Sequence, residues 1–236
     1  MFYTVYLNPT IDRTVYLHEF LPGRTNRPYR VLEDGAGKAI NVAVVLKILG
    51  ASVACIGLLP GAGGQIIQSR LDDYGIPYEF LETDERARVN VKIFDDSTRT
   101  VTEINEKGIR VSEEKLQMIA NTVKTVAKNR DMVFLAGSLP DGCNPRFYAD
   151  LINALNKKGV HCVLDAAGEA LRLGVEAGPY FIKPNREELS ALFEIQDPEL
   201  KEFARAAREL AERIPYVMVS LGEAGALIAD RTKALF

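Results

Sequence analysis

Residues 33–50 read EDGAGKAINVAVVLKILG, a glycine-rich turn followed by an apolar helix that Gly50 ends. Gly35 and Gly37 permit a positive φ and a close approach of the backbone to a ligand. A helix that begins at Lys38 directs free N–H groups and a partial positive charge to the same place, and Lys38 adds a full charge. Such a start suits an anionic or hydroxyl-rich small molecule. The apolar residues that follow predict a helix that is buried nearly all round.

An ordinary strand-to-helix turn in a buried α/β core explains the same stretch equally well. A Walker A loop is excluded, because Leu32 and Ala39 stand where that motif needs glycine and a hydroxyl residue. The glycines of residues 61–64 do not form a dinucleotide-binding fingerprint, since Ile66 occupies one of its glycine positions. The sequence therefore favours neither a P-loop nor a conventional NAD site.

Composition excludes several classes of protein. The 236 residues are 47% hydrophobic and 26% charged, which is enough for one large domain with a substantial core. A net charge of −3 without a basic stripe argues against nucleic acid as a partner, and no signal or membrane segment is apparent. The cysteines Cys55, Cys143 and Cys162 lack paired spacing, which predicts reduced thiols and a cytoplasmic protein. His18 and His161 are far apart, so no metal cluster is predicted.

Short apolar runs alternate with helical stripes along most of the chain, which predicts an α/β fold with a mostly parallel sheet between helices. Strands are expected at residues 2–7, 14–17, 52–58, 78–81, 132–136, 160–164, 180–182 and 216–220. Residues 8–13 are expected to end the first strand. Residues 88–93 and 99–104 alternate strictly around a turn, which predicts a hairpin outside the main core. With residues 14–17 this hairpin is expected to form a small β lid.

Ligands of such folds bind beyond the carboxyl ends of the strands, and several polar residues are expected there. They are Asn8, Asp12, the turn at residues 37–41, Ser138, Asp165, Lys183, Asn185, Glu188, Ser220 and Gly222. The carboxylate of Asp12 can accept two bonds from a sugar diol, and the Asn41 amide can both donate and accept. A phosphate could be held by Lys38, Arg88, Arg24 or Arg27. Each of these alone is also explained as a cap, a turn or a solvated charge.

Two further motifs have both a structural and a functional interpretation. Asn185 and Glu188 can hold the water shell of Mg²⁺, or they can form a helix capping box. The glycine turn at residues 220–225 can bind nucleotide phosphates, or it can simply close a hairpin.

Taken together, the motifs resemble the ribokinase-like (PfkB) carbohydrate kinase family, in the branch of the 1-phosphofructokinases and tagatose-6-phosphate kinases. They occur in the order of the family over nearly the whole chain, at residues 7–13, 36–43, 88–93, 137–140, 183–189 and 220–226.

The resemblance implies a role for each matching residue. Sugar hydroxyls would be bound by Asp12, Gly37 and Asn41, and the phosphate of the substrate by Lys38, Arg88 and Ser138. The nucleotide-binding residues would be Lys183, Asn185, Glu188, Ser220, Gly222 and Gly225, with ATP as donor and Mg²⁺ near Asn185 and Glu188 rather than directly on the protein. The β elements in residues 14–31 and 88–104 would form the lid, which often pairs two subunits in this family, so a homodimer is expected.

The sequence departs from the family pattern in three ways. Ala39 and Val44 replace a usual glycine and a common basic residue, and the methyl group of Ala39 is expected to crowd the substrate. The Gly-Ala-Gly-Asp segment with the catalytic Asp is missing, and Phe236 falls inside an expected hairpin. We therefore expect the ribokinase-like domain of residues 1–236 to lack its C-terminal part and its base, which would lie beyond Phe236. Alone it should bind sugar phosphate weakly without turnover.

The parent protein is thus predicted to be a phosphosugar kinase that phosphorylates a ketohexose monophosphate, with fructose 1-phosphate favoured over tagatose 6-phosphate. A non-catalytic sugar-phosphate or nucleotide sensor on the same fold is the alternative. A kinase of nucleosides or unphosphorylated sugars is a third possibility, and it predicts that Lys38→Ala and Arg88→Ala leave the affinity for sugar unchanged.

Overall fold

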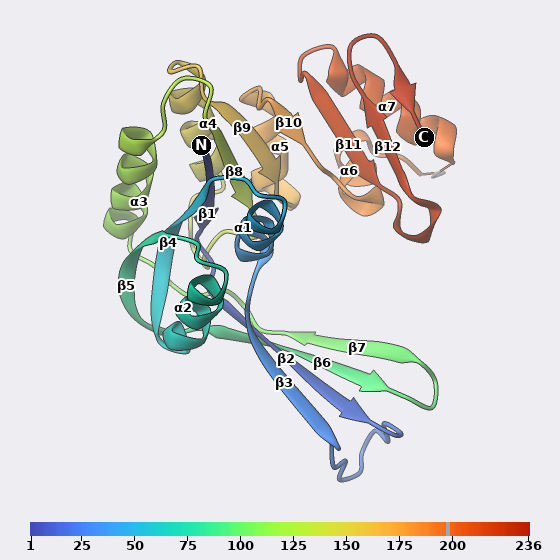
Figure 1. The fold of residues 1–236 in the computed structure, drawn as a ribbon. Helices are drawn as coiled ribbons and strands as arrows, with labels where there is room; N and C mark the ends of the chain where they lie inside the picture. The colour runs from blue at the N-terminus through green and yellow to red at the C-terminus, as the bar shows by residue number, and fades with distance from the viewer. Residues whose placement is uncertain (197–198) are drawn as a thin grey trace.

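The computed structural model describes residues 1–196 and 199–236, which form a large and a small sheet (Figure 1). In spatial order the strands of the large sheet are β13 (Ala234–Leu235), β12 (Ala226–Ala229), β11 (Tyr216–Ser220), β10 (Phe181–Ile182), β9 (His161–Asp165), β8 (Met132–Ala136), β1 (Phe2–Tyr6), β4 (Val53–Ala62) and β5 (Tyr78–Arg86). All neighbours from β11 to β5 are parallel, and β12 and β13 join antiparallel at one edge. The predicted α/β fold with a mostly parallel sheet is confirmed.

Helices cover the large sheet from both sides. The described helices are α1 (Lys38–Ile48), α2 (Gly64–Asp73), α3 (Glu113–Val126), α4 (Phe147–Asn156), α5 (Gly168–Glu176), α6 (Arg186–Phe193) and α7 (Leu200–Ala211). Neighbouring residues of β1 point to opposite faces: Val5 joins the core under α3 to α7, and Tyr6 joins a second core under α1 and α2. None of the described helices is long and apolar enough to cross a membrane.

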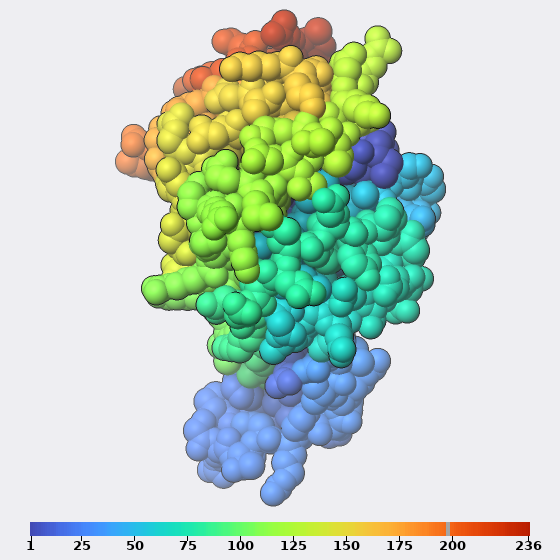
Figure 2. Space-filling model, turned by 90° about the vertical axis from the view of Figure 1, so that its left-hand side faces the viewer, coloured from blue at the N-terminus to red at the C-terminus, as the bar shows by residue number. Residues whose placement is uncertain are grey.

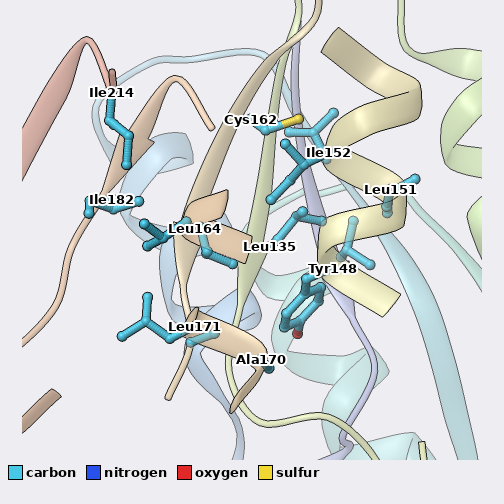
Figure 3. Close-up of a cluster of buried hydrophobic side chains, with 14 of the residues drawn as sticks. Leu135, Tyr148, Leu151, Ile152, Cys162, Leu164, Ala170, Leu171, Ile182 and Ile214 are labelled. Atoms are coloured by element: carbon cyan, nitrogen blue, oxygen red, sulfur yellow. The ribbon is translucent and has the colours of Figure 1, made fainter. Parts of the chain in front are cut away.

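The larger core is built from side chains that the strands and helices contribute together. Figure 3 shows Leu135 of β8 and Leu164 of β9 packed against Tyr148 and Ile152 of α4, with Leu171 of α5 nearby. Each large apolar side chain buried in this way stabilises the fold by roughly 1.5–3 kcal/mol. This packing holds the carboxyl ends of β1, β8 and β9 in place.

The small sheet consists of β3 (Arg30–Ala36), β2 (Thr10–Leu17), β6 (Arg88–Asp95) and β7 (Thr100–Asn105), in that order. It projects from the large sheet (Figure 1), and the blue residues of β2 and β3 form a lobe of their own in the space-filling view (Figure 2). The predicted hairpin is confirmed as the antiparallel pair β6–β7, and β6 also pairs in parallel with β2.

Two expectations about the small sheet were wrong. Residues 8–13 do not simply end the first strand, because β2 already begins at Thr10. Residues 33–36 are not part of a turn but the end of β3, a strand that the sequence did not predict. The sequence of β3 does not alternate between apolar and polar residues. Seven residue pairs with β2 hold the strand in place. A Cβ at Gly35 would lie 2.6 Å from the Cα of Ile67, so this glycine allows β3 to pack against α2.

The expectation that α1 is buried nearly all round was also wrong. Ala39, Ile40, Ala43 and Val44 are buried, but Val45, Ile48 and Leu49 at its end are 55%, 66% and 76% exposed. Only one side of α1 contacts the sheet, through β1, β4 and β8. Apolar composition alone could not show that the other side faces outward.

Tyr6 joins the two sheets at the end of β1. Its hydroxyl accepts a hydrogen bond from the Thr10 N–H at 2.7 Å and donates one to the Ala36 carbonyl at 2.7 Å. These two residues are the first of β2 and the last of β3. Burial raises the pKa of Tyr6. The side chain therefore stays protonated at neutral pH and keeps both bonds.

Candidate active site

A cavity of about 420 Å³ opens where β1 and β8 end, at the base of the small sheet. It brings together four of the six predicted substrate-binding residues, namely Gly37, Lys38, Arg88 and Ser138. It is also lined by Tyr6, Leu7, Asn8, Ala136, Gly137, Leu139, Cys143, Pro145, Ala167 and Ala170. The carboxyl ends of the strands thus converge as expected for a parallel sheet.

Gly37 and Lys38 mark the start of α1 at the edge of this cavity. Gly37 is the N-cap residue with φ 112°, a conformation that favours glycine. A Cβ there would lie 2.9 Å from the Tyr6 ring, so a larger residue would also lack space. As a glycine, Gly37 has no side chain with which to cap the helix. Free N–H groups of the first turn are therefore available to an anion.

Lys38 is held by Asp165, the last residue of β9. The Nζ of Lys38 lies 2.7 Å from Asp165 Oδ1, and the Nζ of Lys183 lies 3.4 Å from Oδ2. The Asp165 side chain is only 12% exposed. One carboxylate therefore bridges Lys38, a predicted phosphate-binding residue, and Lys183, a predicted nucleotide-binding residue. The sequence placed Asp165 at a strand end but assigned it no role, because a contact over 127 residues leaves no local pattern.

Arg88 and Ser138 are oriented by Thr10 and Asn8, two residues to which the sequence had assigned no role. Arg88 Nε donates to Thr10 Oγ1 at 2.7 Å, which leaves the rest of its guanidinium for the cavity. Asn8 Nδ2 donates to Ser138 Oγ at 2.8 Å. Burial lowers the pKa of Arg88, whereas Tyr6 and Asp12 act in the opposite direction. An arginine nevertheless keeps its charge in a protein.

Two other predicted ligands lie outside the lining of this cavity. Asp12 projects from β2, where it contacts residues of β6. Asn41 is exposed on α1, and its Oδ1 accepts a bond from Arg70 at 3.3 Å. Arg24 and Arg27 lie in the connection between β2 and β3, away from the cavity lining.

Ala39 does not crowd the cavity, contrary to our expectation. Its side chain is 1% exposed and belongs to the core under α1, together with Ile40 and Ala43. Cys143 does line the cavity, and no sequence pattern had indicated it. Burial raises the pKa of the Cys143 thiol to about 11, so it is protonated at neutral pH.

The predicted nucleotide residues gather at the ends of β10 and β11. Asn185 and Ser220 form a bridge between these strand ends, and the Ser220 N–H donates to the Pro184 carbonyl. Gly222 begins a short 3₁₀ turn, η1 (Gly222–Ala224), and Gly225 follows it with φ 97°. This turn connects β11 to β12. Both interpretations of the glycine turn, a hairpin turn and a phosphate-binding loop, are compatible with that position.

Asn185 and Glu188 form a complete capping box on α6. Asn185 Oδ1 accepts from the Glu188 N–H at 2.8 Å, and Glu188 Oε2 accepts from the Asn185 N–H at 2.8 Å. The structural interpretation of this motif is therefore confirmed. A part in holding Mg²⁺ stays a prediction, and it would have to use the remaining oxygen positions of these side chains.

Replacing Asn185 with alanine should lower the free energy of unfolding by about 1–2 kcal/mol, because α6 loses its N-cap. Ser112, which caps α3 by accepting from Lys115 N–H, provides a matched control in Ser112→Ala with a loss of about 1 kcal/mol. Urea unfolding of both variants measures the two losses. An unchanged stability of Asn185→Ala would show that the capping box contributes nothing to the fold.

Comparison with known proteins gives a consistent picture. Residues 6–236 match the sequence model of one protein family, the pfkB family carbohydrate kinases. A 1-phosphofructokinase of Haemophilus influenzae is 35% identical over 225 residues, which cover 95% of this chain and 72% of that protein. A 1-phosphofructokinase of Borreliella burgdorferi is 32% identical over 237 residues, covering 100% of this chain and 76% of the relative.

Solved structures agree with the sequence relatives. Phosphofructokinase-2 from Escherichia coli in complex with substrates and products is 28% identical with a TM-score of 0.93, covering 99% of this chain and 76% of that one. The same enzyme in complex with fructose-6-phosphate gives a TM-score of 0.92 at 28% identity, covering 99% and 78%. With a family match over nearly its whole length, the chain belongs to the pfkB family of carbohydrate kinases, in the branch that includes the 1-phosphofructokinases.

Proposed function

We propose that this kinase transfers the γ-phosphoryl group of ATP to a primary hydroxyl of a ketohexose monophosphate, with fructose 1-phosphate favoured over tagatose 6-phosphate. The observation that carries the proposal is the pairing of Lys38 and Arg88 in one cavity at the start of α1. Two cations and free helix N–H groups are suited to a phosphate that the substrate already carries. Fructose 1-phosphate is favoured because both sequence relatives described above are 1-phosphofructokinases.

In this proposal the small sheet acts as a lid over the sugar. Arg88 and Lys38 hold the phosphate with Ser138, and Asp12 accepts bonds from sugar hydroxyls. Asn41 lies one helical turn beyond Gly37, where its amide would meet a hydroxyl after exchanging its bond to Arg70. Fixing the sugar in this way supplies the orientation on which phosphoryl transfer depends.

The nucleotide is assigned to the ends of β10 and β11. Lys183 would donate to the ATP phosphates, and the turn from Ser220 through Gly222 to Gly225 would line the site. The described residues hold no cluster of three His, Cys, Asp or Glu side chains suited to a metal. Mg²⁺ needs few carboxylates when phosphates and waters complete its shell, so the oxygen positions of Asn185 and Glu188 that the capping box leaves unused would hold waters of the ion. When bound, it would neutralise charge on the transferring phosphates.

We further propose that residues 1–236 by themselves bind the sugar phosphate without turnover. Two carboxylates that belong to the proposed site or contact it are already paired with cations, Asp165 with Lys38 and Lys183, and Asp12 with Lys92. Neither is placed as a free base that takes a proton from a sugar hydroxyl.

A homodimer through the small sheet is also proposed. Its face opposite Asp12 carries adjoining apolar residues, with Val31 beside Val15 and Val91 beside Ile104. Val31 and Ile104 are exposed. Such a face suits an interface between identical lids. Sedimentation equilibrium that gives only the monomer mass at micromolar concentration would contradict it.

Calorimetric titration with four sugars tests the function. Fructose 1-phosphate should bind most tightly, tagatose 6-phosphate and fructose 6-phosphate more weakly, and fructose without phosphate weakest. Equal affinity for fructose and its phosphates would overturn the assignment. An ADP-release assay with the same protein should show no turnover above background, and substantial turnover would disprove the inactivity of residues 1–236.

A further inference from the structure

The small sheet carries polar side chains beside Asp12 that the proposed function does not use. Asn90 pairs with Asp12 across β2 and β6, and Lys92 follows two residues later. Side chains alternate along a strand, so Asn90 and Lys92 project from the same face as Arg88. Since Arg88 lines the cavity, this face of the small sheet is the one directed to the proposed sugar site.

These two residues engage both carboxylate oxygens of Asp12. Asn90 Nδ2 donates to Oδ1 at 3.2 Å, and Lys92 Nζ donates to Oδ2 at 2.6 Å. Glu103 lies directly opposite Lys92 on β7 but accepts a bond from Asn105. Lys92 thus reaches across to β2, and both side chains that bond the Asp12 carboxylate in the described part of the chain come from β6.

The cluster retains unused hydrogen-bonding capacity. An ammonium group has three donors, of which Lys92 uses one for Asp12, and a carboxylate has about four acceptor positions, of which two are taken. The Oδ1 atom of Asn90 is buried, and it has no partner among the residues that the structure describes. A buried acceptor without a partner is costly, so a donor supplied by a ligand would stabilise it.

A sugar hydroxyl both donates and accepts, so it matches a carboxylate beside an ammonium group. One hydroxyl can donate to Asp12 while it or its neighbour accepts from Lys92. A phosphate group does not suit a position beside Asp12, because the carboxylate repels a dianion. The chemistry of the cluster is therefore complementary to adjacent hydroxyls, whereas the cavity with Arg88 and Lys38 is complementary to the phosphate.

We propose that Lys92 determines specificity for the hydroxyls of the sugar: it fixes Asp12 and, together with it, presents an adjacent donor and acceptor to them. This inference rests on the proposed phosphosugar site and adds to it the residue that distinguishes a sugar from other phosphate esters.

A double-mutant cycle measured by calorimetry tests the inference. Lys92→Met should weaken binding of fructose 1-phosphate on the order of tenfold, as expected for loss of one charged hydrogen bond. It should leave the affinity for inorganic phosphate unchanged. In an Asp12→Asn background the same change should have a smaller effect, because the two residues act as a unit. Lys92→Arg should restore most of the affinity, and Lys107→Met, at an exposed lysine after β7, should behave as wild type.

Each contrary result has a distinct meaning. An equal loss of affinity for inorganic phosphate would make Lys92 a phosphate ligand and overturn the inference, as would additive effects in the cycle or an unchanged affinity in Lys92→Met. If the wild-type protein does not bind fructose 1-phosphate, the proposed function itself fails and the inference fails with it. If Lys92→Met does not fold, Lys92→Gln is judged by the same criteria.

Discussion

Replacing Arg88 with alanine should weaken the binding of fructose 1-phosphate to residues 1–236 by a factor of about one hundred. Arg88 is half-buried at the cavity, and Thr10 already orients its guanidinium at 2.7 Å. A preoriented arginine can donate two parallel bonds to a phosphate, and each charged hydrogen bond contributes about 1.5–3 kcal/mol. Calorimetric titration gives the affinity directly, and the affinity for fructose without phosphate should change little.

Two further variants separate charge from geometry. Arg88→Lys keeps the charge but loses the planar arrangement of donors, so its affinity should fall between wild type and Arg88→Ala. Arg110→Ala removes an arginine whose side chain is 83% exposed and paired with Asp141, and it should bind like wild type. If Arg88→Ala retained wild-type affinity for fructose 1-phosphate, the assignment of the cavity to the phosphate would be wrong, and a kinase of unphosphorylated sugars would be favoured.

Replacing Tyr6 with phenylalanine should lower the free energy of unfolding by about 3 kcal/mol. The Tyr6 side chain is 2% exposed, and its hydroxyl is bonded to the Thr10 N–H and the Ala36 carbonyl. Both partner residues are buried, so the substitution leaves two backbone groups unsatisfied, each at a cost of about 1–3 kcal/mol. For a domain of this size the melting temperature should fall by roughly 6–12 °C, measurable by calorimetry.

The loss should be localised to the junction of the two sheets. Amide hydrogen exchange should be faster in β2 and β3, whose ends Tyr6 ties to β1, and less affected in β8 and β9. Tyr74→Phe removes a hydroxyl from a ring that is 40% exposed at the end of α2, and its stability should match wild type. A Tyr6→Phe protein as stable as the control would show that the hydroxyl does not hold the small sheet.

The sequence by itself determined the features that depend on neighbouring residues. Apolar runs predicted the strands of the parallel sheet, because a strand buried on both faces needs continuous apolar residues. Strict alternation predicted the β6–β7 hairpin, which the structure contains as an antiparallel pair. The short spacing of Asn185 and Glu188 indicated a capping box as one of two interpretations, and the glycine before Lys38 permitted the positive φ found at the start of α1.

Only the tertiary structure decided which distant residues meet. The strand β3 has no apolar pattern of its own and exists through its pairing with β2 and its approach to α2. The bond between Lys92 and Asp12 spans 80 residues, and that between Lys38 and Asp165 spans 127. The periodicity of apolar residues indicates which side of one segment is buried. It carries no information on how two sheets are oriented relative to each other. The cavity and the pairing of its charges are set by that orientation, so they could be recognised only once the chain was folded.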